Sequence, residues 1–267
     1  MFCLSHYCWL NFLSGRSLHF LEADCHRYLE SAKQLNRING VFFLSPLTKL
    51  IAALTDSGLG IETYLDGKSA DLFTDHLVLV DAIWNAYLGK YQIAADLYFG
   101  QCGHYDSTYP AMHVGMWAKF IAGVCAYDVA TNTGRAKYRK LANKVRATVH
   151  SWVKNGNPNA NHYACLLDAE FYRMKGNFAE ACKFYENASI MAGRIGLLHD
   201  AALVHERYAI HLLNSVSRAE EEAIFRLRKA VKLYSEWGAV GKVRLLHEKH
   251  GDLLRAASSV FGKSTHN

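Results

Sequence analysis

Side chains that could do nucleophilic or acid–base chemistry are scattered along the chain. Four of them lie close together in the sequence: Cys102, His104, Asp106 and His113. A thiol or an imidazole beside a carboxylate is the combination that hydrolases and transferases use to activate a nucleophile. The spacing of these four residues matches no catalytic signature. An enzyme with a site assembled from them is therefore the alternative function, and it requires a partly buried cluster of titratable groups in one pocket.

Two sequences look like phosphate-binding loops and fail the pattern. The sequence GKST at 262–265 has Ala257 where the loop requires a glycine, and a helical pattern rather than a strand precedes it. The sequence GKS at 67–69 has Glu62 in the same place. Because neither sequence can cradle a phosphate on its backbone amides, we expect no nucleotide binding.

The histidines and cysteines also lack the spacing of a metal site. His247 and His250 are three residues apart, whereas the helix of a metalloprotease carries its two histidines four residues apart. The seven cysteines are scattered and odd in number, and they form no CxxC pair, so we expect free thiols in a reducing compartment. The sequence therefore predicts no metal and no cofactor.

The segment 135–154 concentrates positive charge and contains no acidic residue. Its basic residues are Arg135, Lys137, Arg139, Lys140, Lys144, Arg146 and Lys154. The same segment carries an apolar stripe at helical spacing, made of Tyr138, Leu141, Val145, Val149 and Trp152. The pattern predicts a basic amphipathic helix.

Such a helix can face an acidic partner, or it can bury its stripe while its charges stay in water. We expect the second arrangement, and we take Arg135, Lys137, Lys140 and Lys144 as the candidate partner-binding residues. No aromatic residue interleaves the exposed face to stack on bases, so we do not expect nucleic-acid binding.

The elements that must position these residues are helices. The chain of 267 residues has a net charge of +6 and is 51% hydrophobic, as is typical of a soluble folded protein. It contains only 3 prolines, and alanine and leucine greatly outnumber valine and isoleucine. Such a composition favours helices throughout. We therefore expect an all-α protein of about twelve helices whose short connections make consecutive helices antiparallel neighbours.

No targeting or membrane segment is evident. The first fourteen residues are apolar, but they lack the positive start of a signal peptide and are too short to span a bilayer. We expect no membrane insertion and a cytoplasmic location.

Local signals mark several helix ends. Gly40 and Gly238 each follow a helical pattern, where a left-handed residue can end a helix. Asn177 followed by Glu180 is the asparagine form of a capping box, and Pro46 stands where a helix could begin.

Two segments, 89–98 and 176–185, repeat the pattern Gly-x-aromatic-x-x-Ala-x-x-x-Tyr. This is the turn and second helix of a tetratricopeptide-type hairpin, in which a small residue lets two helices approach. The repeat residues, with those that extend the pattern, are Gly89, Ala94, Tyr98, Ala169, Gly176, Ala181, Tyr185 and Ala188. The copies are spaced more widely than the standard repeat of about 34 residues. We therefore expect an irregular tetratricopeptide-like α-solenoid that forms one domain over 1–267.

Three segments carry a resemblance to a known family. They are 152–176, which begins WVKNGNPNANH and includes Glu170 and Arg173, then 199–209, and then 234–242 with the pattern Tyr-x-x-Trp-Gly-Ala-x-x-Lys. In this order they resemble the helical region of very large multi-sensor signalling kinases, the hybrid histidine kinases with a P-loop ATPase. In those chains a serine/threonine-kinase-like head and the ATPase come first, and a GAF domain and a histidine kinase follow.

The resemblance implies the non-catalytic middle region alone, because the sequence contains none of the kinase, ATPase or GAF elements. The apolar start resembles the second half of a helix hairpin, so a fragment of a longer chain is one expectation. Stacked helix hairpins commonly bind other proteins. We expect a scaffold or regulatory module in signal transduction, with proteins or other domains of a larger chain as partners.

Trp237 and Gly238 are expected to be structural. The glycine ends the helix that contains Tyr234, and the indole is expected to pack over the turn against the following helix.

Overall fold

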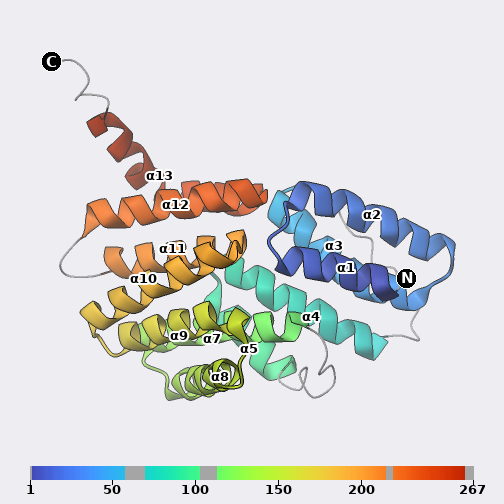
Figure 1. Ribbon diagram of the computed structural model, residues 1–267, viewed down its shortest axis with the longest axis horizontal. Coiled ribbons are helices and arrows are strands. Elements are labelled where there is room, and N and C mark those ends of the chain that lie inside the picture. The colour runs from blue at the N-terminus through green and yellow to red at the C-terminus, as the bar shows by residue number, and fades with distance from the viewer. Residues whose placement is uncertain (1, 58–69, 103–112, 215–218, 262–267) are drawn as a thin grey trace.

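The computed structural model describes residues 2–57, 70–102, 113–214 and 219–261, and within these ranges the chain forms α-helices, one short 3₁₀ helix and no strand. The fold is all-α, as the composition predicts (Figure 1). The helices are α1 (Phe2–Leu13), α2 (Leu18–Gln34), α3 (Ile38–Thr55), α4 (Ala70–Tyr87), α5 (Tyr91–Gln101), α7 (His113–Thr133), α8 (Ala136–Lys154), η1 (Pro158–Ala160), α9 (Asn161–Met174), α10 (Phe178–Ile195), α11 (Leu198–Leu213), α12 (Glu220–Trp237) and α13 (Val240–Phe261).

The start of α10 follows from its local sequence. The side-chain oxygen of Asn177 accepts a hydrogen bond of 3.2 Å from the backbone N–H of Glu180. This bond satisfies one of the N–H groups that a helix start leaves without an intrahelical partner. The predicted cap is confirmed.

The start of α3 differs from the prediction. The helix begins at Ile38 and includes both Gly40 and Pro46, which are buried inside it. Asn36 takes the positive φ of 49° just before the helix, in a conformation that asparagine tolerates better than most residues. The prediction of helix boundaries at Gly40 and Pro46 was wrong, because burial of this segment outweighs the low helix propensity of the two residues.

Consecutive helices pack on one another as hairpins, most extensively α11 on α12, α9 on α10 and α7 on α8, and α4 packs on α5 in the same way. The turns into α5 and α10 use the left-handed conformation of Gly89 and Gly176, with φ of +74° and +72°. The other repeat residues are at most 3% exposed, and they are Ala94, Tyr98, Ala169, Ala181, Tyr185 and Ala188. Small residues at these positions let the paired helices approach closely.

The N-terminal helices and the last two helices meet along a seam, where α12 contacts α1 and α4, and α13 contacts α3 (Figure 1). Trp237 at the end of α12 is fully buried, and its ring centroid lies 5.4 Å from that of Phe12 and 6.2 Å from that of Tyr87. The sequence predicted the following helix as the partner of this indole. Its ring partners come instead from α1 and α4, and from His199 on α11, which stacks on it at 5.1 Å.

The seam continues where α13 crosses α3. A Cβ atom on Gly241 would lie 2.8 Å from the carbonyl oxygen of Ala53, so the close approach of the two helices requires a glycine here. One turn later, Arg244 forms an ion pair with Asp56 at the end of α3. In an open solenoid each repeat contacts only its neighbours. The seam is therefore a contact that the repeat pattern does not predict.

One described helix, α3, is long and apolar enough to cross a membrane by length and composition. In the structure, 67% of its apolar window is buried inside the protein. Core helices of folded domains share this composition.

Candidate functional site

Helix α11 carries charged residues into the middle of the protein. Nearly all of its side chains are buried, and Asp200, Glu206 and Arg207 are among them. A buried charge is costly unless it is paired and hydrogen-bonded. Each of these three residues belongs to a separate set of polar contacts that joins α11 to other helices.

The first set, which we call the charged core, consists of Asp128 on α7, Glu170 and Arg173 on α9, and Arg207 on α11. Arg207 donates from Nε to Glu170 Oε1 at 2.6 Å and from Nη2 to Asp128 Oδ1 at 2.7 Å. Arg173 Nη1 donates to the same two carboxylates, at 3.0 Å each. Two positive and two negative charges thus neutralise one another among three helices.

Two aromatic residues complete the surroundings of the charged core. The hydroxyl of Tyr185 donates to Glu170 Oε1 at 2.9 Å. The guanidinium carbon of Arg207 lies 4.8 Å from the centroid of the Tyr91 ring, which is a favourable cation–π distance.

The carboxylates of the charged core stay ionised. Burial alone would raise the pKa of Asp128 and of Glu170, but the positive charges of Arg207 and Arg173 hold both pKa values below their ordinary range. A general acid or base needs a pKa near the working pH. Neither carboxylate is therefore poised for proton transfer at neutral pH.

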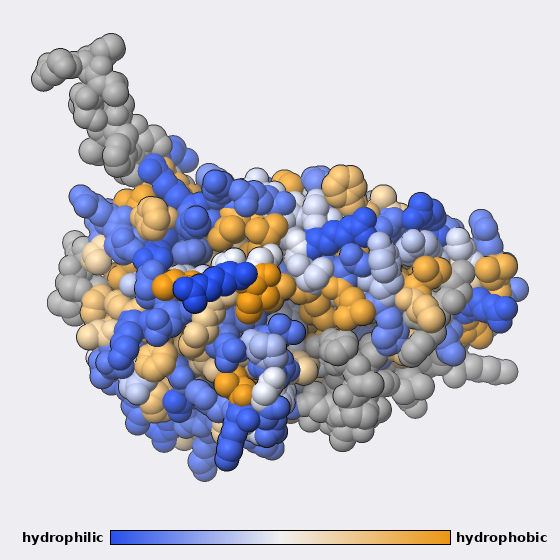
Figure 2. Space-filling view, in the orientation of Figure 1, coloured by the Kyte–Doolittle hydropathy of each residue, from blue (hydrophilic) through white to orange (hydrophobic). Residues whose placement is uncertain are grey.

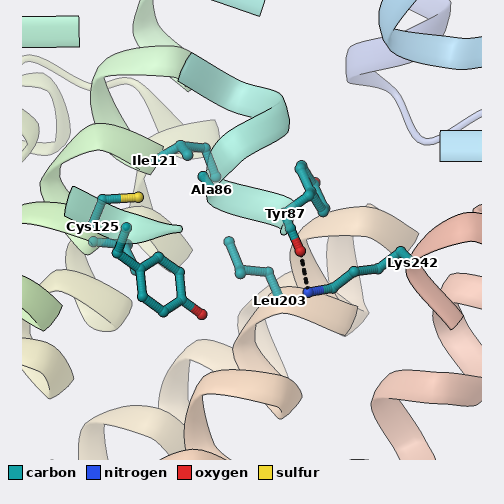
Figure 3. Close-up of a pocket in the computed structure, with 8 residues that line it drawn as sticks. Ala86, Tyr87, Ile121, Cys125, Leu203 and Lys242 are labelled. Carbon is teal, nitrogen blue, oxygen red and sulfur yellow. Dashed lines mark hydrogen bonds between the residues drawn. The ribbon is translucent and has the colours of Figure 1, made fainter. Parts of the chain in front are cut away.

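The second set of polar contacts, around Glu206, lies on the seam. Lys242 on α13 donates from Nζ to the backbone carbonyl oxygen of Tyr87 on α4 at 2.6 Å (Figure 3) and to Glu206 Oε1 at 2.7 Å. The hydroxyl of Tyr234 on α12 donates to the other carboxylate oxygen of Glu206 at 2.9 Å. A buried ion pair thus joins α4, α11, α12 and α13.

The third set surrounds Asp200 near the start of α11. Its carboxylate lies 2.8 Å from Nε2 of His162 on α9 and accepts a hydrogen bond of 3.1 Å from the indole of Trp117 on α7. Burial alone would raise the pKa of Asp200, but the charge of His199 and the hydrogen bond from His162 lower it. A histidine beside a carboxylate also occurs in catalytic triads. Here both partners are at most 1% exposed, so no substrate reaches them.

A small cavity beside the second set is lined by Tyr87, Tyr91, Cys125, Leu203 and Lys242 among others (Figure 3). Its volume of about 10 Å³ has room for about one water molecule. Burial raises the pKa of the Cys125 thiol, which is therefore not a nucleophile at neutral pH. The cavity cannot hold a substrate.

Of the four residues considered for an enzyme, only Cys102 has a described side chain. Cys102, which follows α5, is buried. His104 and Asp106 lie outside the described residues, and so does the side chain of His113. Both GKS sequences also lie outside them. Among the described residues, no group of three or more His, Cys, Asp or Glu side chains could hold a metal ion.

The basic helix predicted at 135–154 is α8. Its apolar stripe points inward, since Tyr138, Val145 and Val149 are buried and Leu141 and Trp152 are half-buried. The expectation that the stripe enters the protein is confirmed. Hydrophilic side chains gather at the lower edge of the molecule, where α8 lies (Figure 2).

The basic face of α8, which consists of Arg135, Lys137, Lys140 and Lys144, is exposed. Lys137 Nζ lies 3.3 Å from Asp96 Oδ1 on α5. For Lys140 and Lys144, the described part of the chain supplies no carboxylate at ion-pair distance.

A further positive charge stands beside this face on α7. Burial, together with the nearby charge of Lys144, lowers the pKa of Lys119.

A surface groove of about 370 Å³ lies between the start of α5 and the end of α7. It is lined by residues 89–93 and by Asp128, Val129, Asn132 and Thr133. The groove neighbours the basic face, because Ile93 and Asp96 are three residues apart on one side of α5 and Asp96 pairs with Lys137.

The sequence does not predict the three buried sets, although most of their members stand in the segments that carry the family resemblance. The available signal was charge inside an apolar run, since Asp200, Glu206 and Arg207 interrupt a largely apolar helix. Such charges require partners when buried. Which partners they find depends on which helices meet, and spacing along the chain does not contain that information.

The fold and its contacts define the class of protein: an all-α protein of packed helix hairpins, with paired charges inside and a basic helix outside. Comparison of the chain with family models, with curated proteins and with solved structures finds no match.

Proposed function

We propose that this chain is a non-catalytic helical-repeat scaffold, a regulatory module that binds other proteins in signal transduction. The proposal rests on a contrast between charges that are paired inside the protein and charges that are exposed on its surface. In the described residues, the charges of α11 are neutralised by buried partners in sets that leave no space for a substrate. The lysines of α8, by contrast, are open to solvent and available to a partner.

The buried sets also favour a scaffold. Arg207, Glu206 and Asp200 each bond to residues of other helices, so the arrangement of the helices is fixed by directional contacts as well as by apolar packing. A surface held rigid before binding loses little conformational entropy when a partner docks.

The signalling context rests on the resemblance to the helical region of multi-sensor signalling kinases. The partners we propose are cytoplasmic proteins or other domains of a larger signalling chain. Nucleic acid is not among them, because the basic face lacks aromatic side chains for base stacking. Membrane insertion is not proposed, since the apolar stripe of α8 points inward.

Site-specific cross-linking in cells tests the proposal. A photoreactive amino acid is placed singly at Lys140 on α8, Lys183 on α10 and Lys232 on α12, which are all exposed. We expect a discrete cross-linked protein from at least one position and not from all three. Absence of cross-links at every position, together with a turnover activity lost in Cys102→Ala, would favour the enzyme alternative instead.

A further inference from the structure

We propose that the basic face of α8 and the neighbouring groove together bind an acidic segment of a partner protein, which places one apolar side chain beside Ile93. This inference rests on the proposed function and deepens it by naming the chemistry of the partner.

The charges of the basic face have a regular spacing. Lys137, Lys140 and Lys144 are three and four residues apart, so they lie on one side of α8 and span about 10 Å along its axis. A segment with two or three carboxylates over the same length can meet these ammonium groups in turn.

The groove supplies an apolar contact next to these charges. Ile93 is 51% exposed, and Val129 forms part of the groove lining. A single aliphatic side chain of the partner would cover Ile93, while Asn132 and Thr133 offer polar groups to its backbone.

The carboxylate in the groove does not oppose an acidic partner. Asp128 is paired with Arg173 and Arg207, and its second oxygen accepts a hydrogen bond of 2.8 Å from Asn132. Its negative charge is therefore already neutralised from within the protein.

A protein segment fits this surface better than a nucleic acid or a bilayer does. Around Lys137, Lys140 and Lys144, the exposed side of α8 carries Ala136, Asn143 and Ala147, and the ring of the exposed His150 further along the helix is held 2.9 Å from Asp168. The side chains around the three lysines can neither stack on a base nor insert into a membrane. An acidic peptide provides both the carboxylates for the lysines and the apolar side chain for the groove.

Fluorescence anisotropy with the full chain tests the inference. The probe is a labelled dodecapeptide of glutamate and alanine with one central leucine. One comparison peptide replaces the leucine with serine, and another replaces every glutamate with glutamine. Single-stranded oligothymidylate and phosphatidylserine vesicles are tested in the same way, as representatives of nucleic acids and membranes.

The variants separate local charge from net charge. K140E/K144E removes the proposed contacts, and K183E/K232E makes the same change of charge on α10 and α12. Ile93→Asp tests the groove, with the exposed Phe225→Asp on α12 as its matched control.

We expect salt-sensitive binding of the leucine peptide that weakens at least about tenfold in K140E/K144E and stays nearly unchanged in K183E/K232E. Ile93→Asp and the serine peptide should each weaken binding several-fold, and the glutamine peptide should not bind. Equal losses in the two charge-reversal variants, or equal binding of the leucine and serine peptides, would overturn the inference. The inference would also be overturned if oligothymidylate or the vesicles bound more tightly than the leucine peptide and this binding depended on Lys140 and Lys144. Cross-links at Lys183 or Lys232 without peptide binding would overturn this inference alone and leave the proposed function standing.

Discussion

The charged core and the basic face differ in what the loss of one charge does to the protein. Arg207 is fully buried and bridges two carboxylates, so its removal leaves Arg173 as the single positive charge between two buried negative charges. Lys140 is exposed and faces water, so its removal leaves nothing unpaired. We therefore expect the fold to depend on the charges of α11 and to be little affected by loss of the lysines of the basic face. A surface that folding does not use is free to serve binding.

The largest expected effect comes from breaking the charged core. Arg207→Ala should destabilise the protein by about 3–5 kcal/mol, because it leaves Asp128 and Glu170 underpaired in the interior. The measurement is urea unfolding followed by circular dichroism at neutral pH. Arg139→Ala on the exposed side of α8 is the control and should change stability by less than about 0.5 kcal/mol. Equal costs for the two variants would remove the distinction between the regions.

The second largest effect is expected from acid, which should lower the stability of the folded protein through His205 on α11. Burial, together with the charges of Arg226 and Lys229, lowers the pKa of His205 on α11 to about 4 from 6.5. The unfolded chain therefore takes up this proton at a higher pH than the folded protein does. The stabilisation is fully present above about pH 6.5 and is lost as the pH falls toward 4, by up to about 3 kcal/mol. Urea midpoints across this range measure the loss.

One variant measures the share of that loss that comes from His205. His205→Gln removes this titrating group and should reduce the slope of the pH profile, and the remaining slope comes from His199, His211 and His250, whose pKa values burial also lowers. Below about pH 4 the lowered pKa values of Asp128 and Glu170 predict a further loss, since these carboxylates must then be protonated. A urea midpoint that stays constant between pH 6.5 and 4 would contradict the assignment of His205.

A matched pair of hydroxyl deletions sharpens the comparison. Tyr185→Phe removes a hydrogen bond to the buried Glu170, and Tyr138→Phe removes the bonds to the half-exposed Asp96. The first should cost about 2 kcal/mol and the second below about 1 kcal/mol, because water can replace the lost partner only at the surface. Thermal unfolding of the two variants gives both numbers. A larger cost for Tyr138→Phe would mean that the contact between α5 and α8 is more important to the fold than its exposure indicates.

The smallest effect on stability is expected from reversing the basic face. The triple variant K137E/K140E/K144E loses the exposed ion pair of Lys137 with Asp96 and the contact of Lys137 with the Tyr138 ring, and exposed contacts of this kind contribute little. We expect a melting temperature close to that of the parent chain and an unchanged helical spectrum. Loss of the fold in this variant would show that the face is structural, and it could no longer be regarded as a surface reserved for partners.

The sequence predicted the fold class and the local ends of helices, since these depend on residues close together in the chain. The cap at Asn177 and the turns at Gly89 and Gly176 are of this kind. Pro46 shows the limit, because its place inside α3 depends on the burial of the surrounding segment.

In the candidate site, too, the features that depend on neighbouring residues were predicted and those that depend on distant helices were not. The basic face and the inward stripe of α8 are visible in one helical period, and both were predicted. The partners of Arg207 come from α7 and α9, and the ring partners of Trp237 come from α1, α4 and α11. Such pairings follow from the packing of distant helices, which the spacing of residues does not determine.

The seam also constrains how many helix hairpins can lie between α3 and α13. Gly241 brings α13 against the carbonyl of Ala53, and Lys242 then reaches the carbonyl of Tyr87. An additional hairpin inserted between these helices would carry the two sides of the seam apart and break both contacts. An open array of repeats can grow or shrink by duplication of one unit. This chain can change by substitution within its hairpins, but the number of hairpins between α3 and α13 is set by the distance that the seam must close.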